Sequence, residues 1–337
     1  MKIKHFKYVI IIAAICIGMG TSGLASAGGF PQKDLTGIIM WGAGGATDNV
    51  ARSITPLVEP YLGKKIILQN KPGATGAIAT QWVYNQKADG YTLLYGAENP
   101  QLYRLLGISK LDYKDFVPIN VLARGVAVIV ANVNTPWKSL KDLIEDAKKR
   151  PGKINMGSTG PGGLPYVVGA LLKTVNGVTF NPIPFGGEGP AITAMEGGHV
   201  DFSSVGVTAA REHLRAKRLK ALAVVSDKPI PGLEGVPTIT SIYPEYKKYL
   251  PWGPFYGVWA KKGIPEEARK KLVAAFKKGF DDPKFQKFLK DFGAVPMGLS
   301  GKEADKFLKH WQSVSCWMIY EAGGAKTSPD KLGIPKP

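Results

Sequence analysis

Apolar and polar residues follow two different periods along this chain, and both are clear between residues 34 and 62. Leu35–Met40 is a short, mostly apolar run, which is typical of a strand buried on both faces. From Val50 to Leu62 the apolar residues recur three and four positions apart, as on one face of a helix. The pattern predicts a strand, a loop and a helix, with Thr47 or Asp48 as the N-cap.

The succession of strand and helix repeats along the chain, which predicts an α/β fold with mostly parallel sheets. Everything after Pro265 has a helical pattern. Two pairs, Ser139 with Asp142 and Ser300 with Glu303, have the spacing of capping boxes at helix starts. The other predicted strands are 65–68, 91–95, 125–131, 153–156, 182–184, 219–225 and 255–260.

Two glycine-rich loops, 41–48 and 157–163, each join a predicted strand to a predicted helix. Glycines leave backbone N–H groups accessible, and the helix dipole adds positive charge, so such a loop suits an anion. A dinucleotide fingerprint is excluded because Gly42 and Gly44 would need a third glycine where Thr47 stands, and no P-loop motif is present. One loop alone could be a plain turn, but two of the same design predict an anion held from both sides.

Other residues could extend this site. Gly96 and Ala97 follow a predicted strand, and ligands of parallel sheets lie at the carboxyl ends of strands. A simple turn explains this pair equally well. Several aromatic residues could line a pocket that tolerates an aromatic ligand, or could belong to the core: Trp41, Tyr166, Phe185, Phe202 and Trp252.

The first 27 residues have the pattern of a secretory signal peptide. Three lysines precede an apolar run at 8–20, and Ala25-Ser26-Ala27 is a small-residue cleavage site. The apolar run is too short for a membrane span. Cys16 does not fit a lipoprotein signal because Ile15 precedes it, where a small residue is expected. We therefore expect cleavage after Ala27 and a periplasmic mature protein.

Composition changes this picture in three ways. The chain has 337 residues, which is more than one core usually holds, so two lobes are expected. Its formal charge of +18 favours an acidic ligand or a membrane surface over nucleic acid, although most lysines have the spacing of solvated helix faces. Cys316 is the only cysteine after residue 27, which excludes an internal disulfide, and its apolar neighbours predict a core position.

Two other classes of function remain open at this point. Asp48, Glu188 and Asp201 could form a carboxylate pair of a hydrolase or another enzyme, but nothing in the sequence places them together. The remaining histidines show no metal-ligand spacing. A cationic surface or scaffold protein that binds anionic polymers or membranes would explain the charge but not the paired glycine loops. We expect no enzyme activity, no cofactor, no metal and no nucleic-acid partner.

Several motifs in order resemble the tripartite tricarboxylate transporter substrate-binding (TctC-like, or Bug) family. Each motif is weak alone, but the ordered set covers nearly all of the mature chain. The motifs are 41–48, 70–76 with Asp89-Gly90-Tyr91, 157–163, 185–189, Gly198-His199-Val200-Asp201 and 219–225.

The resemblance implies a two-lobed, Venus-flytrap periplasmic-binding-protein fold, in which two crossing strands act as the hinge. Lobe 1 would comprise residues 28–124 and 257–337, and lobe 2 residues 125–256. The protein would be a monomer that captures a small mono-, di- or tricarboxylate, possibly aromatic, and delivers it to the membrane permease subunits of the transporter. Gly42-Ala43 replaces the family's usual proline, and Val205-Gly206 replaces acidic or amide residues, which leaves the far end of the ligand open.

The loops, the strand end, the aromatic residues and the resemblance together give a set of candidate ligand-binding residues. They are Trp41, Ala43, Gly44, Gly45, Thr47, Asp48, Gly96, Ala97, Ser158, Thr159, Gly160, Gly162, Gly163, Tyr166, Phe185, Asp201 and Gly206.

The N-terminal pattern makes a testable prediction. Protein recovered from the cell envelope should begin at Gly28 and carry no lipid, because the small-residue site ends at Ala27. Intact-mass measurement decides this directly. A species that begins at an acylated Cys16 would contradict it.

Overall fold

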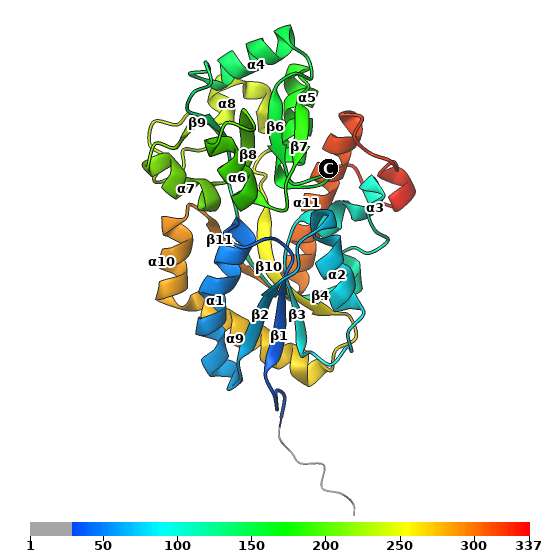
Figure 1. Ribbon diagram of the computed structural model, residues 1–337. Helices are drawn as coiled ribbons and strands as arrows, with labels where there is room; N and C mark the ends of the chain where they lie inside the picture. The colour runs from blue at the N-terminus through cyan, green and yellow to red at the C-terminus, as the bar shows by residue number, and fades with distance from the viewer. Residues whose placement is uncertain (1–28) are drawn as a thin grey trace, which may run out of the picture.

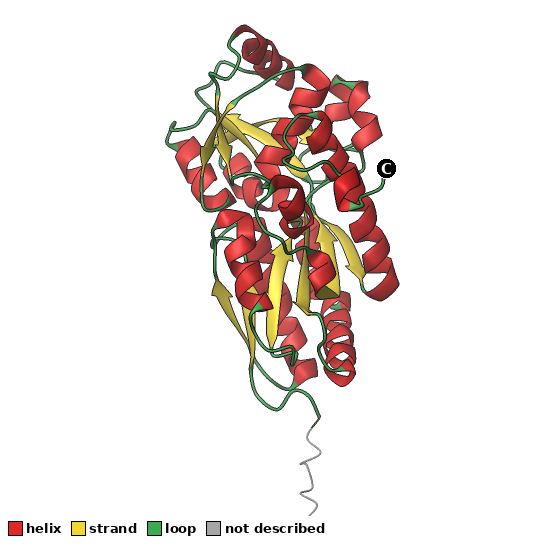
Figure 2. Ribbon diagram, turned by 90° about the vertical axis from the view of Figure 1, so that its right-hand side faces the viewer, coloured by secondary structure: helices red, strands yellow, loops and turns green. Residues whose placement is uncertain are grey.

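The computed structural model describes residues 29–337, so the expected signal peptide and its cleavage site lie outside the described residues. The strands gather in two sheets, one in each half of the molecule, and helices surround each sheet (Figures 1 and 2). We call the sheet that contains residues 35–39 sheet A and the other sheet B, and the corresponding halves lobe 1 and lobe 2.

Sheet A has the strand order β11-β4-β10-β3-β1-β2. β1, β2 and β3 pair in parallel, whereas β10 runs antiparallel to both of its neighbours and β11 antiparallel to β4. Its strands are β1 (Leu35–Ile39), β2 (Ile66–Asn70), β3 (Thr92–Ala97), β4 (Phe116–Arg124), β10 (Phe255–Lys261) and β11 (Val295–Leu299). The helices of this lobe are α1 (Ala46–Leu62), α2 (Ala77–Tyr84), α3 (Tyr103–Leu106), α9 (Glu266–Asp281), α10 (Pro283–Asp291) and α11 (Gly301–Glu321).

Sheet B has the strand order β7-β6-β8-β5-β9, and only β5 runs against the others. Its strands are β5 (Ala127–Asn132), β6 (Asn155–Ser158), β7 (Asn181–Pro184), β8 (Phe202–Gly206) and β9 (Leu219–Val225). Its helices are α4 (Leu140–Lys149), α5 (Leu164–Asn176), α6 (Glu188–Glu196), α7 (Val207–Arg215) and α8 (Ile239–Ile242). The prediction of two α/β lobes is confirmed, and each sheet is mixed, with most of its strands sharing one direction.

The chain passes between the sheets twice, and the two passages touch. β4 leads into β5 through Gly125 and Val126, and residues 250–254 lead back into β10. The Gly125 N–H donates to the Pro254 carbonyl at 2.7 Å. The antiparallel strands β5 and β10 are the ones that follow these passages, because each enters its sheet from the side of the other lobe (Figure 1).

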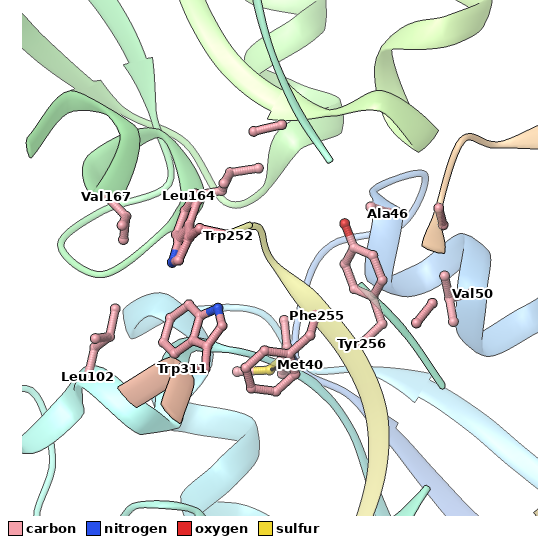
Figure 3. Packing of buried hydrophobic residues seen from close by; sticks show 14 of the residues in the cluster. Met40, Ala46, Val50, Leu102, Leu164, Val167, Trp252, Phe255, Tyr256 and Trp311 are labelled. Carbon is pink, nitrogen blue, oxygen red and sulfur yellow. Dashed lines mark hydrogen bonds between the residues drawn. The ribbon is translucent and has the colours of Figure 1, made fainter. Parts of the chain in front are cut away.

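One hydrophobic core extends through both lobes at this junction. Figure 3 shows Trp252, Phe255 and Trp311 close together there, with Leu164 of lobe 2 and Met40 of lobe 1 nearby. The Trp252 indole N–H donates to Ser315 Oγ at 2.9 Å, and that of Trp311 donates to the Gly253 carbonyl at 2.8 Å. α11 therefore contacts the connecting segment directly, besides packing on β4 of lobe 1 and α5 of lobe 2.

The structure corrects three local predictions. Residues after Pro265 are not all helical, because Val295–Leu299 form β11 on the edge of sheet A. The Ser139–Asp142 capping box is present, but Ser300 makes no side-chain cap bond although it stands at the N-cap position. The N-cap of α1 is Gly45, so neither Thr47 nor Asp48 has that role.

Gly253 lies so close to the other passage between the lobes that we expect this position to tolerate no side chain. A Cβ atom built on Gly253 would lie 2.2 Å from the Gly125 carbonyl oxygen, a backbone atom that cannot rotate away. Gly253→Ala should lower the free energy of unfolding by about 1–3 kcal/mol through overpacking. Denaturant unfolding measures this change.

Gly186→Ala is the matched control, because no heavy atom lies within 4 Å of its Cβ position. It should change stability by no more than about 0.5 kcal/mol. Equal stabilities of the two variants would show that the passages can separate freely.

Candidate functional site

A small cavity lies where the two lobes meet, at the carboxyl ends of strands β1, β3 and β6. Its volume is about 30 Å³, which is room for about one or two water molecules. Both lobes and the segment that connects them contribute to its wall. The lining residues are Trp41, Gly45, Ala46, Thr47, Ala97, Glu98, Thr159, Leu164, Glu188, Pro254 and Tyr256.

The first glycine loop is held from inside by Asp48. This carboxylate is buried and accepts the Gly44 N–H at 3.1 Å, Asn70 Nδ2 at 2.9 Å and Arg52 Nε at 3.0 Å. Burial alone would raise its pKa, but the hydrogen bonds from Arg52, Asn70 and Gly44 outweigh burial and lower it. Asp48 therefore stays ionised and fixes the loop to the first turn of α1, whose Ala46 N–H donates to Glu188 in the cavity wall.

The second glycine loop brings Thr159 to the cavity. Gly160 and Gly162 have φ values of +89° and +80°, which favour glycine, and Gly163 is the N-cap of α5. The Thr159 side chain lies over Gly163, where a Cβ atom would come within 1.9 Å of its Oγ1. Ser158 stays in the loop, where its Oγ accepts the Gly160 N–H at 3.2 Å.

Contacts between the lobes fix this loop against lobe 1. Asn99 Nδ2 donates to the Gly162 carbonyl at 2.7 Å, and Trp41 Nε1 donates to Asn99 Oδ1 at 3.2 Å. Thr75 Oγ1 donates to the Thr159 carbonyl at 3.4 Å. Asn99 thus connects the two glycine loops.

The structure brings only some of the candidate residues to the cavity. Those that line it are Trp41, Gly45, Thr47, Ala97 and Thr159. Gly206 lies close by, because a Cβ atom there would be 3.1 Å from the Tyr256 hydroxyl and 3.3 Å from the Ala46 Cβ. Asp48, Ser158, Gly160, Gly162 and Gly163 shape the loops behind the wall.

The other candidates lie elsewhere. Ala43 and Gly44 are exposed and do not line the cavity. Gly96 faces Tyr113 and Trp259 in the core, and the Tyr166 hydroxyl donates to the Gly324 carbonyl. Two further candidates belong to lobe 2 alone: Phe185 is half-buried and packs against its core, and Asp201 accepts the Asn155 N–H at the amino end of β8.

Two glutamates in the cavity wall were not predicted as site residues. Glu98 follows β3 and is 2% exposed, and its Oε2 has no hydrogen-bond partner in the described structure. Burial raises the pKa of Glu98 to about 8; the backbone N–H groups of Glu98 and Phe255 oppose the rise, and the Glu188 charge adds to it. The sequence signal was the position of Glu98 directly after Gly96 and Ala97 at the strand end.

Glu188 begins α6 in lobe 2 and reaches across to lobe 1. Its Oε1 accepts the Gly206 N–H at 2.9 Å, and its Oε2 accepts the Ala46 N–H at 3.4 Å. Burial raises its pKa, and these two N–H groups oppose the rise. The pairing of Glu188 with Asp48 or Asp201, considered from the sequence, is absent, because Glu188 faces Glu98 instead.

Comparison with known proteins identifies the family. The family model described as the tripartite tricarboxylate transporter family receptor matches residues 50–323. The chain belongs to this receptor family. The match includes α1 from residue 50 onward, the second glycine loop and both passages between the lobes.

Solved structures of similar proteins share the fold of this receptor. The periplasmic binding protein BugD is 30% identical, with a TM-score of 0.83 over 88% of this chain and 100% of its own. A protein of R. palustris with adipate is 26% identical, with a TM-score of 0.80 over 87% and 98% of the two chains. MatC of Rhodopseudomonas palustris with bound malate is 27% identical, with a TM-score of 0.77 over 87% and 100%.

Three further features of the receptor bear on its chemistry. Within residues 29–337, no group of three or more His, Cys, Asp or Glu side chains is placed to hold a metal ion. The same part of the chain contains no helix with the length and apolar character of a membrane span. Cys316 is buried in α11, as predicted, and burial raises the pKa of its thiol to about 12.

Glu98 predicts an unusual pH dependence of stability. Its ordinary pKa is 4.5 and its folded-state pKa is about 8, so the folded protein binds this proton more tightly than the unfolded chain. The resulting stabilisation is complete below pH 4.5 and is lost as the pH rises towards 8. Between pH 5 and 8 the parent should lose up to about 1.4 kcal/mol per pH unit relative to Glu98→Gln.

Denaturant unfolding of the ligand-free parent and Glu98→Gln at several pH values measures this difference. The variant removes the titrating proton while keeping the size of the side chain. Parallel stability curves for the two proteins between pH 5 and 8 would refute the assignment.

Proposed function

We propose that this protein is an exported receptor that captures a small carboxylate between its two lobes and delivers it to the membrane permease of a tripartite transporter. Membership of the receptor family and the adipate and malate complexes of two similar proteins support the ligand class. The proposed ligand contacts are the backbone N–H groups of the glycine loops and of the helix starts beside them.

The single observation that carries this proposal is the environment of the Glu188 carboxylate. One of its oxygens accepts an N–H group from the start of α1 in lobe 1, and the other accepts one from the N-cap of α7 in lobe 2. Helix starts favour anions because their N–H groups lack partners and carry the positive end of the dipole. This arrangement supports a carboxylate held between the lobes by neutral backbone donors.

The remaining parts of the proposal concern assembly. Residues 28–124 and 257–337 would form one closing unit and residues 125–256 the other, with the touching passages at Gly125 and Pro254 as the pivot. Ligand contact with both lobes would stabilise the closed form by its differential affinity. The mature protein would begin after Ala27, act in the periplasm as a monomer, and require neither a cofactor nor catalysis.

A thermal-shift screen of mono-, di-, tri- and aromatic carboxylates tests the ligand class, because a ligand that binds only the folded state raises its melting temperature. At least one carboxylate should stabilise the protein, and moderate salt should weaken binding only slightly, since a buried site is poorly screened. A collapse of affinity between low and moderate salt would favour a cationic surface instead.

Gly45→Pro tests the backbone donors of the first loop. Gly45 lines the cavity with a φ of −78°, which proline can adopt, so this substitution removes an N–H group without demanding a new backbone conformation. Loss of a hydrogen bond to a charged ligand should cost about 1.5–3 kcal/mol, or about ten- to a hundredfold in affinity.

Two control variants accompany it. Ala43 is exposed in the same loop and does not line the cavity, so the Ala43→Pro variant should bind the ligand like the parent. Gly45→Ala keeps the N–H group, and its added Cβ would lie 3.6 Å from the Gly42 carbonyl oxygen, an ordinary contact. Parent-like binding by folded Gly45→Pro would show that the loop is only a turn.

A further inference from the structure

The two lobes also touch outside the cavity, at Arg211 of α7. On the flank of the molecule away from α11, α7 of lobe 2 lies beside α10 of lobe 1 (Figure 1). The turn after α10 packs against it, because a Cβ atom built on Gly293 would lie 2.9 Å from Arg211 Nη2 and 3.0 Å from Val207 Cγ1. Lobe 1 therefore covers one side of the Arg211 guanidinium group.

Arg211 has few partners for a charged side chain in such a place. It is 6% exposed, and its Nε has no hydrogen-bond partner in the described structure. Nη2 donates to the Pro231 carbonyl at 2.7 Å, and no carboxylate within residues 29–337 forms an ion pair with this guanidinium group. Buried charges are normally paired, because taking a charge out of water costs free energy that only close partners return.

Nearby acidic groups reduce this cost without removing it. Burial lowers the pKa of Arg211, and the charge of Arg215 adds to the fall. Three acidic groups oppose the fall but do not outweigh it: Asp291, Glu234 and Glu212. The largest opposing effect comes from Asp291 of lobe 1, which is exposed and ion-paired with Lys287. Arginine stays charged in proteins, so lobe 1 covers a charge that it does not neutralise.

Separation of the lobes would return water to this group from one side. Gly232 belongs to lobe 2, like Arg211, and a Cβ atom there would lie 2.5 Å from Nη1, so this loop would stay in place. Gly293 would move away with lobe 1. The guanidinium group would then regain hydration on the side that Gly293 now covers, and the open form would gain the corresponding free energy.

We propose that Arg211 holds the ligand-free receptor open. Closure covers its charge without supplying an ion pair, so the closed form is disfavoured until a bound ligand offsets the cost. A ligand that prefers the closed form shifts the equilibrium by its differential affinity for the two forms. This inference rests on the closure of the lobes in the proposed function, and it assigns the opposing force to one side chain outside the cavity.

Arg211→Met and Arg211→Gln test the inference in the ligand-free protein. Both remove the charge, and glutamine does so without adding apolar surface. Hydrogen exchange of the peptides that contain Ala46 and Gly206 reports contact between the lobes, because both N–H groups donate to Glu188 there. Their protection should rise about tenfold in both variants, since an unpaired charge no longer opposes closure.

Two control variants keep a charge at position 211. Arg211→Lys should exchange like the parent. Arg215→Met removes a charge one turn further along α7, from an exposed side chain that is ion-paired with Glu212 at 3.0 Å. It should leave the protection of both peptides unchanged.

Small-angle X-ray scattering adds a readout that needs no variant. The ligand-free parent should give a larger radius of gyration than the structure with touching lobes, and the two neutral variants a smaller one than the parent. A parent profile that matches the structure overturns the inference. Unchanged protection in a folded neutral variant also overturns it. Lower protection does so as well, because Arg211 would then stabilise the closed form.

The outcomes separate this inference from the proposed function. Exchange and scattering use ligand-free protein, so a negative result there leaves the carboxylate receptor intact. If no carboxylate stabilises the protein in the thermal-shift screen, the proposed function fails, and the exchange comparison still decides the role of Arg211.

Discussion

The backbone N–H groups at the helix starts need acceptors, and this requirement governs the interface between the lobes. The first turn of a helix leaves its N–H groups without intrahelical partners. In this protein the starts of α1 and α7 approach each other from different lobes, and the Glu188 carboxylate of lobe 2 satisfies one N–H group from each. A side chain thus bridges the lobes through the same donors that are proposed to hold a ligand.

The passages between the lobes impose a second constraint. The strands cross so closely that glycine is required at Gly253, and the tryptophans Trp252 and Trp311 fill the space beside them. This junction is well packed with buried aromatic side chains, whereas the cavity wall combines apolar side chains with carboxyl and hydroxyl groups. Because the chain crosses between the lobes twice at this junction, the junction would act as the pivot under the proposed function, and the cavity would be the part that opens.

Local sequence patterns predicted the scaffold of the site better than its chemistry. Glycine loops between a strand and a helix have a local signature, and both loops lie at the interface as expected. No local sequence pattern marks Glu98 and Glu188 as residues of the cavity wall, because an acidic residue after a strand or at a helix start is usually solvated. Only long-range packing brings these two side chains together. β11 was missed for a similar reason, since its pairing with β4 is a tertiary contact.

The charge of the whole chain and the charge of the cavity have opposite signs. A formal charge of +18 raises the local concentration of anions and can speed their encounter with the protein. None of that charge lies on the described residues of the cavity wall, where the titratable groups other than Tyr256 are glutamates. Under the proposed function, long-range attraction and close recognition would therefore be carried by different residues. Surface lysines would favour the approach of any acid, and selection among acids would fall to neutral backbone donors and to the two buried carboxyl groups.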